Sequence, residues 1–228
     1  MLLALETAND QCSVALVDMA GQVLAQRHDD RAREQTRLLL PMIDAVLAEV
    51  QISLSQVLAI AFSRGPGSFS GIRINAAVTQ ALAWAHDLPV LPISTLEATA
   101  QAALLECPAD RIMVVLDARM NEVYVAAYQR DAVGILQLVG AEQLLGYPAV
   151  QLPAEWQDDA EVLWVGSGVK LLPHVSMSRR LEAVSATARQ IAQLGLHAYH
   201  AGQAVSALHA LPVYLRDDAW KKIAEQGC

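Results

Sequence analysis

The apolar positions of the chain change period several times, and each period predicts a different element. Three short segments with strand-like alternation follow one another near the start, at residues 2–5, 12–18 and 23–27. The connections between them are too short for a crossover, so they predict antiparallel hairpins. Apolar residues then recur at i, i+3, i+4 and i+7 spacing over residues 33–50. This spacing predicts a helix that Pro41 kinks or restarts.

The same patterns continue to residue 92 and then begin again. The first half is completed by a strand, a helix with Ser68 as its N-cap, and another strand, at residues 57–62, 68–86 and 88–92. The second half opens with three predicted strands and continues with a strand, a helix and a strand, at residues 111–116, 122–129, 135–139, 162–165, 186–200 and 212–216. An acidic residue, Glu6 or Asp117, ends the first strand of each half, and the repeated opening indicates an internal duplication.

Alternation of strands and helices after each three-strand opening is typical of an α/β fold. We therefore expect two similar βββαβα halves, at residues 1–105 and 106–228. No segment rich in Gly, Ser or Pro separates them, so they are expected to pack closely around residues 100–109.

The two predicted helices of the first half carry more apolar surface than one sheet can cover. A surface helix is polar over much of its circumference, whereas a helix that is apolar nearly all round is buried on two sides. One side is expected to cover the sheet of its own half. The other side requires a partner, either the second half of this chain or another protein. The candidate interface residues are Leu39, Leu40, Ile43, Val46, Ile72, Ala76, Ala77, Val78, Ala81 and Trp84.

A glycine-rich string joins a predicted strand to the second of these helices. Its characteristic residues are Gly65, Pro66, Gly67, Ser68, Gly71 and Arg73. Backbone N–H groups at such a junction are able to hold a phosphate. The string nevertheless matches neither a P-loop nor a G-x-G-x-x-G motif. The alternative is a tight turn in which small residues permit close packing.

Composition and charge exclude several classes of protein. Hydrophobic residues make up 54% of the chain and charged residues 18%, which is the opposite of a disordered composition. No stretch approaches the ~18 uncharged residues that span a bilayer, so no membrane association is expected. The net charge of −8 does not provide the basic surface that a protein needs to bind nucleic acid alone. The three widely spaced cysteines fit reduced thiols, so we expect a cytoplasmic protein.

Six segments of the chain resemble the bacterial TsaB (YeaZ) family. They are L-A-L-E-T-A, C-S-V-A-L, S-R-G-P-G-S-F-S-G-I-R, V-L-D-A-R-M-N-E-V-Y, V-G-S-G and P-V-Y-L-R…A-W-K-K, beginning at Leu3, Cys12, Ser63, Val115, Val165 and Pro212. They follow the order of the family and span almost the whole chain. The glycine-rich string is the most specific of them.

The resemblance implies the fold of actin-like ATPases and sugar kinases (the ASKHA fold), in which two duplicated halves each have an RNase H-like core. In such proteins, hairpin carboxylates hold a hydrated magnesium ion at the phosphates of a nucleotide. Glu6 and Asp117 are the matching residues here, as a possible vestigial nucleotide site. Against binding, the hairpin after Glu6 lacks the glycine that lets phosphates approach the backbone.

The resemblance also implies a function. Proteins of this family are needed to make threonylcarbamoyladenosine at the adenosine beside the anticodon of tRNA. The paralogous subunit TsaD transfers the threonylcarbamoyl group, TsaB is its obligatory partner, and the small ATPase TsaE joins the assembly. TsaD-like subunits hold their metal through two histidines in a segment resembling Asn-His-x-Glu-Gly-His. Thr95 and Thr99 stand at the matching positions, and a threonine hydroxyl does not replace imidazole as a ligand.

These considerations predict a non-catalytic subunit without a cofactor, which binds and positions TsaD through the two over-apolar helices. Alone, the same surface is expected to form a homodimer. Contact with tRNA is expected only through the complex, because the chain is acidic. The alternative is a free-standing ATPase, kinase or peptidase of the same fold.

Overall fold

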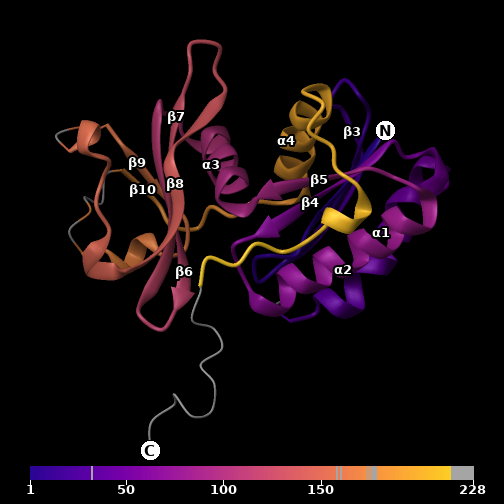
Figure 1. Cartoon of the computed structure of the whole chain (residues 1–228), viewed down its shortest axis with the longest axis horizontal. Helices are drawn as coiled ribbons and strands as arrows, with labels where there is room; N and C mark the ends of the chain where they lie inside the picture. The colour runs from indigo at the N-terminus through magenta and orange to yellow at the C-terminus, as the bar shows by residue number, and fades with distance from the viewer. Residues whose placement is uncertain (32, 158, 160, 174, 176–178, 217–228) are drawn as a thin grey trace, which may run out of the picture.

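The chain folds into two lobes, each built on a five-stranded sheet (Figure 1). The computed structural model describes residues 1–31, 33–157, 159, 161–173, 175 and 179–216. The strands of the first sheet are β1 (Leu2–Glu6), β2 (Cys12–Val17), β3 (Val23–Asp29), β4 (Ala59–Gly65) and β5 (Val90–Ser94). Those of the second sheet are β6 (Arg111–Arg119), β7 (Glu122–Arg130), β8 (Leu136–Gly146), β9 (Leu163–Val165) and β10 (Arg180–Leu181).

The two sheets have the same topology. The first has the order β3-β2-β1-β4-β5, and the second, read from the other edge, has the order β8-β7-β6-β9-β10. In each sheet the first three strands form an antiparallel meander, and the fourth and fifth strands run parallel to the first. The predicted duplication is therefore confirmed, and the fold is the actin-like, RNase H-like α/β arrangement.

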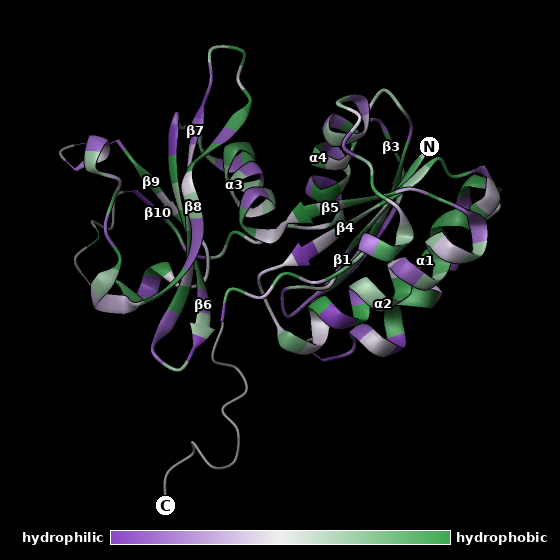
Figure 2. Ribbon diagram, in the orientation of Figure 1, coloured by the Kyte–Doolittle hydropathy of each residue, from purple (hydrophilic) through white to green (hydrophobic). Residues whose placement is uncertain are grey.

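In the part of the chain that the structure describes, four α-helices cover the sheets, and three of them surround the first (Figure 1). The helices are α1 (Gln35–Val50), α2 (Phe69–His86), α3 (Thr95–Glu106) and α4 (Ala188–His200). The first two lie side by side on one face of the first sheet, and α4 packs on the opposite face. Helix α3 packs mainly on β6 and β7, and so connects the two lobes. Figure 2 shows hydrophobic residues on α1 and α2 as well as along the first sheet.

Strand β1 is buried throughout because it has helices on both faces. Successive side chains of a strand point to opposite faces. Accordingly, Leu3 and Leu5 pack with the core beneath α1 and α2, whereas Leu2 and Ala4 pack against α4. All four side chains are 0% exposed. The sequence of β1 is therefore apolar at every position before Glu6, as expected for a central strand.

Helix α4 shows that the division into residues 1–105 and 106–228 does not follow the packing. The helix starts at a capping box, in which Thr187 and Gln190 satisfy each other's backbone N–H groups. Its apolar stripe, which includes Ile191 and Leu196, packs on the first sheet although the helix follows the second sheet in the chain. Gly195 faces Ala61 so closely that a Cβ would overlap it. The second half thus contributes α4, its one long helix within the described residues, to the first.

Two other local predictions are corrected, and one of the two alternatives predicted at Pro41 is excluded. Among the described residues, the second half connects β8 to β9 and β9 to β10 through 3-10 turns rather than full helices, at Tyr147–Ala149, Ala154–Trp156 and Val169–Leu171. The predicted strand at residues 212–216 is not formed, because these residues have no regular secondary structure and belong to neither sheet. Helix α1 runs through Pro41 without restarting. No helix in the described ranges has the length and apolar character needed to cross a bilayer.

Candidate functional site

Half of the residues predicted to form an interface lie inside the chain. Leu39, Ile43, Val46, Ile72 and Ala76 are at most 5% exposed. The first three and Ala76 belong to the core that α1 and α2 form with the first sheet. Their assignment to an outer interface was wrong, because they form the inner stripe of each helix. The apolar excess that sequence periodicity revealed therefore divides into a core face and a smaller outer face.

The outer face of α2 contains the remaining predicted residues of that helix. Ala77, Ala81 and Trp84 are exposed, with Trp84 68% exposed, and Val78 is half-buried. On α1, Leu40 is 50% exposed. Ala77 and Ala81 are one turn apart, so their small side chains leave a shallow strip along which another helix is able to approach closely. These residues remain candidates for a protein interface.

Two aromatic residues that the sequence patterns did not single out extend this face. Phe69 begins α2, and its ring centroid lies 6.4 Å from that of Tyr214. The guanidinium carbon of Arg73 lies 3.5 Å from the Phe69 centroid, and its Nε donates to the Tyr214 hydroxyl at 2.8 Å. All three side chains are exposed. Phe69 was visible within the glycine-rich string, but its contact with a residue 145 positions away was not.

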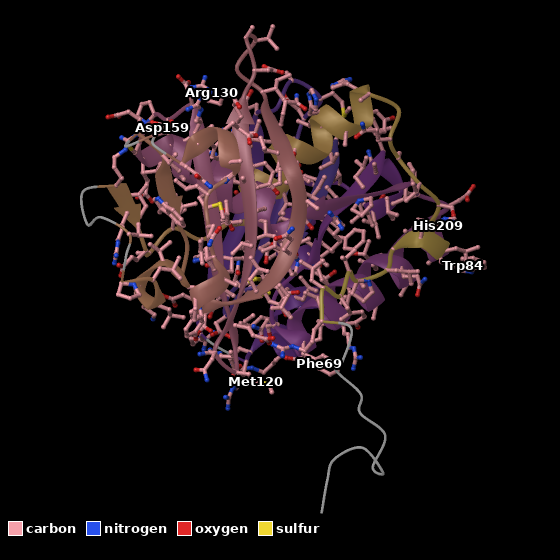
Figure 3. All side chains as sticks on the ribbon, turned by 60° about the vertical axis from the view of Figure 1, so that its left-hand side comes forward. Phe69, Trp84, Met120, Arg130, Asp159 and His209 are labelled. Atoms are coloured by element: carbon pink, nitrogen blue, oxygen red, sulfur yellow. The ribbon has the colours of Figure 1, made fainter. Side chains whose placement is uncertain are left out.

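The segment that carries Tyr214 runs beside α2. Val205 pairs with Val90 at the edge of β5, and the Gln80 side chain donates to the carbonyl of Ala207 at 3.3 Å. Leu208 and Leu211 are 60% and 57% exposed. Figure 3 shows His209 and Trp84 projecting together at one edge of the molecule, with Phe69 projecting from a lower position. The exposed apolar surface is thus larger than α2 alone.

The glycine-rich string packs tightly against the turn after β1. A Cβ on Gly67 would overlap the carbonyl oxygen of Ala8, and a Cβ on Gly71 would overlap that of Thr7. The Ser68 N–H donates to the Ala8 carbonyl at 2.7 Å, and the Thr7 hydroxyl donates to the Gly71 carbonyl at 2.8 Å. Close packing therefore accounts for both glycines. This agrees with the second interpretation of the string, a tight turn in which small residues permit close packing. The loop also contains a cis peptide bond between Gly65 and Pro66.

Glu6 lies beneath this loop as a buried carboxyl group. It is 0% exposed, and its Oε1 accepts from the N–H groups of Ala8 at 2.6 Å and Asn9 at 3.3 Å. Burial raises the pKa of Glu6 to about 7, although hydrogen bonds from Ser63 and these two N–H groups lower it. Asn75 of α2 fastens the helix nearby, because its Nδ2 donates to the carbonyls of Leu5 and Ser63, each at 3.1 Å.

A cleft of about 700 Å³ separates the two hairpin tips that end β1 and β6. Asp117 lines this cleft, whereas Glu6 does not. The structure therefore does not bring the two carboxylates together as the walls of one nucleotide site. Asp117 instead pairs with Arg119 at 3.3 Å, and Arg119 reaches Asp10 of the opposite hairpin at 3.7 Å. Within the described ranges, no three His, Cys, Asp or Glu side chains are grouped as a metal site.

Thr95 and Thr99 are buried in the first turns of α3. Both are 0% exposed, and the Thr99 hydroxyl donates to the Thr95 carbonyl at 2.7 Å. Ser94 caps the helix by accepting from the N–H groups of Leu96 and Glu97 at 3.1 and 3.4 Å. The Ser94 hydroxyl therefore stabilises the start of the helix.

Glu97 is half-buried rather than fully solvent-facing. Burial and the nearby Glu142 carboxylate raise its pKa, although Arg64 lowers it. Arg64 of β4 pairs with Glu142 of β8 at 3.2 Å, and Ser94 also donates to Glu142. These contacts join the two lobes near the start of α3.

Comparisons with known proteins agree on one family. The model described as "TsaD: tRNA N6-adenosine threonylcarbamoyltransferase" matches residues 23–217. The chain is 37% identical to the tRNA threonylcarbamoyladenosine biosynthesis protein TsaB of Escherichia coli K12, over 97% of both chains. The Haemophilus influenzae protein of the same name is 36% identical over 97% of this chain and 96% of its own. A solved structure, "YeaZ from Pseudomonas aeruginosa", superposes with a TM-score of 0.84 at 37% identity and covers 94% of this chain and 99% of its own.

Proposed function

The chain belongs to the TsaB family, and on that premise we propose that it is a non-catalytic subunit in tRNA threonylcarbamoyladenosine biosynthesis. It binds the paralogous transferase TsaD and positions it for the reaction, and TsaE joins this pair. Contact with tRNA is made through the complex, in the cytoplasm. Support for the pathway comes from relatives that share nearly the full length of the chain.

The observation that carries the proposed binding mode is the exposed outer face of α2. Ala77 and Ala81 permit close approach of a helix, and the exposed Trp84 supplies a large apolar anchor at one end. Because α1 lies beside α2, two paired helices of a paralogue would complete a four-helix arrangement with axes about 8–10 Å apart. The same face supports a homodimer when the chain is alone.

The non-catalytic role is supported by what occupies the start of α3. The family resemblance places the metal-binding histidines of TsaD at the positions of Thr95 and Thr99. Here both side chains are buried, and the Thr99 hydroxyl bonds to the helix backbone. A threonine hydroxyl in such a position is a poor ligand for zinc or iron. Catalysis is therefore assigned to the partner.

Ala81→Glu tests the proposed interface. A carboxylate on this strip would be buried without a partner in the complex, so affinity for TsaD is expected to fall by about 100-fold or more. The measurement is co-purification with TsaD, followed by titration calorimetry. Ala154→Glu is the matched control, because Ala154 is exposed on the second half and should leave binding unchanged. Retention of affinity by Ala81→Glu would contradict the proposed interface.

The alternative hypothesis is a free-standing ATPase, kinase or peptidase, which would use the cleft between the hairpins. Nucleotide turnover by the purified chain, lost on Asp117→Asn, would favour that hypothesis. Reconstitution of tRNA modification with and without this chain separates the two functions. If tRNA modification requires the chain, and the purified chain hydrolyses no nucleotide, the result supports the proposed non-catalytic subunit.

A further inference from the structure

We propose that Arg73 binds a carboxylate of the catalytic partner, and that this ion pair favours that partner over a second copy of the chain. The inference rests on the proposed function, because it names a contact within the same interface. Arg73 is exposed on α2, one helical turn before Ala77 and two before Ala81. It therefore borders the strip along which a partner helix would lie.

Arg73 is held in position before any partner binds. Its guanidinium carbon lies 3.5 Å from the ring centroid of Phe69 and 5.5 Å from that of Tyr214. Its Nε donates to the Tyr214 hydroxyl at 2.8 Å. A free arginine loses much rotational freedom when it is ordered at an interface, whereas a stacked and hydrogen-bonded one has lost part of it already. Such a side chain is suited to specific recognition.

The position of Tyr214 is itself fixed from both lobes. The N–H of the preceding residue, Val213, donates to the carbonyl of Arg64 on β4 at 2.8 Å. Two residues later, Arg216 donates to the carbonyl of Ala118 at 3.1 Å and forms an ion pair with Glu122. The support for Arg73 therefore extends to the hairpin between β6 and β7.

Arg73 has no acidic partner among the described residues around it, so we expect the anion to come from another molecule. Within the described ranges, its terminal Nη1 and Nη2 groups make no hydrogen bond or ion pair. Helix α2 contains no Asp or Glu, and neither does the neighbouring segment 205–216. Among the described residues of this acidic chain, Arg73 is thus a cation without a paired anion on this face. The planar guanidinium matches the two oxygens of a carboxylate.

A second copy of the chain offers Arg73 little in return. Its α2 brings another arginine, and the exposed acid Asp87 lies past the end of that helix, at the C-cap. On α1, Glu49 already pairs with Arg27 at 2.6 Å, which leaves Asp44 as an exposed acid without an ion pair among the described residues. A symmetric pair through these helices therefore offers two copies of Arg73 only Asp44 and Asp87 from α1, α2 and its cap, whereas a paralogue is able to carry a carboxylate at the contact itself. This difference in ion pairing makes the chain prefer the paralogue over a second copy of itself.

The experiment compares Arg73→Met and Arg73→Lys with the wild-type full-length chain. Affinity for purified TsaD is measured by titration calorimetry at 50 and 300 mM NaCl, and self-association by sedimentation equilibrium. Arg73→Met is expected to weaken binding to TsaD by about 10- to 100-fold and to reduce its salt dependence. Arg73→Lys keeps the positive charge but lacks the planar pair of N–H donors that matches a carboxylate. This variant should recover part of the lost affinity. Homodimerisation should change by less than about threefold.

Several outcomes would overturn the inference. One is wild-type affinity for TsaD in Arg73→Met; if Ala81→Glu still abolishes binding, the proposed interface stands and only the role of Arg73 is wrong. Another is an equal loss of homodimerisation in Arg73→Met and Asp44→Asn, which would assign the ion pair to the self-contact. A third is intact assembly with weaker tRNA binding by the complex, which would make the arginine an RNA contact. Retained affinity in Ala81→Glu would instead refute the proposed function.

Discussion

Replacing Glu6 with glutamine is expected to stabilise the fold at pH 8 by about 3 kcal/mol. Glu6 is 0% exposed, and burial raises the pKa of its carboxyl group from 4.5 to about 7. At pH 8 the folded chain therefore holds a buried charge that the unfolded chain exposes to water. Glutamine has a neutral side chain of nearly the same shape, and its carbonyl oxygen still accepts from the N–H groups of Ala8 and Asn9.

The magnitude follows from the difference between the two pKa values. A separation of 7 − 4.5, or about 2.5 pH units, at about 1.4 kcal/mol per unit corresponds to about 3 kcal/mol. The raised value means that the folded chain binds the proton more tightly than the unfolded chain. Its stability therefore falls as the pH rises from 4.5 to 7 and is constant above that range. Well below pH 4.5, both states are largely protonated and the wild type loses no stability through Glu6.

The assay is urea unfolding of the wild type and Glu6→Gln at several pH values from 4.5 to 8, followed by tryptophan fluorescence. The difference in unfolding free energy between the two proteins is the relevant quantity, because contributions from other groups cancel. It should grow with pH by about 3 kcal/mol. Glu155→Gln serves as the control, because the Glu155 side chain is exposed to water in the folded chain. A pH-independent difference for Glu6→Gln would refute the argument that burial raises this pKa.

Two further predictions concern packing and thiol chemistry. Gly71→Ala should destabilise the fold by about 2 kcal/mol or more, because its Cβ would overlap the Thr7 carbonyl, whereas Gly146→Ala, with no neighbour closer than 3.9 Å, should be nearly neutral. Equal melting temperatures for the two variants would contradict this account of the glycine-rich string. Cys12 should resist alkylation by iodoacetamide at pH 8 in the native state, because burial raises the pKa of its thiol to about 12, and the half-buried Cys107 should react faster. Peptide mass spectrometry measures both rates, and rapid labelling of native Cys12 would show that its surroundings open.

The sequence predicted the first sheet well because its signals are local. Alternation and short connections in β1 to β3 leave antiparallel pairing as the only arrangement, and the helical period of α1 and α2 is long and regular. The local sequence does not show which of the two sheets α4 covers. Ile191 and Leu196 form an apolar stripe that fits any sheet, and only the tertiary fold directs it to the first one. A division of the chain at residue 105 therefore separates α4 from the sheet that it covers.

The candidate site was predicted in part, and the reason lies in helix geometry. An apolar excess around α1 and α2 indicated two contact surfaces, but periodicity does not say which stripe faces the sheet. Ile72 and Ala76 consequently appeared as interface residues although they are buried. The contact of Arg73 with Tyr214 joins residues 141 positions apart, and no sequence pattern reports such a distance. Long-range pairs of this kind require the folded chain.

Contacts near the glycine-rich string also explain why the outer face of α2 is well placed before binding. The N-terminal half of the helix is fastened to β1 and β4 by the bond from Thr7 to Gly71 and the bonds of Asn75 to Leu5 and Ser63. Each bond is buried, where hydrogen bonds are strong and their loss is costly. A helix anchored in this way does not need to order itself when a partner arrives. The exposed strip from Arg73 to Trp84 is therefore held by the same core that makes Gly71 sensitive to substitution, and changes beneath the helix should weaken assembly without touching its surface.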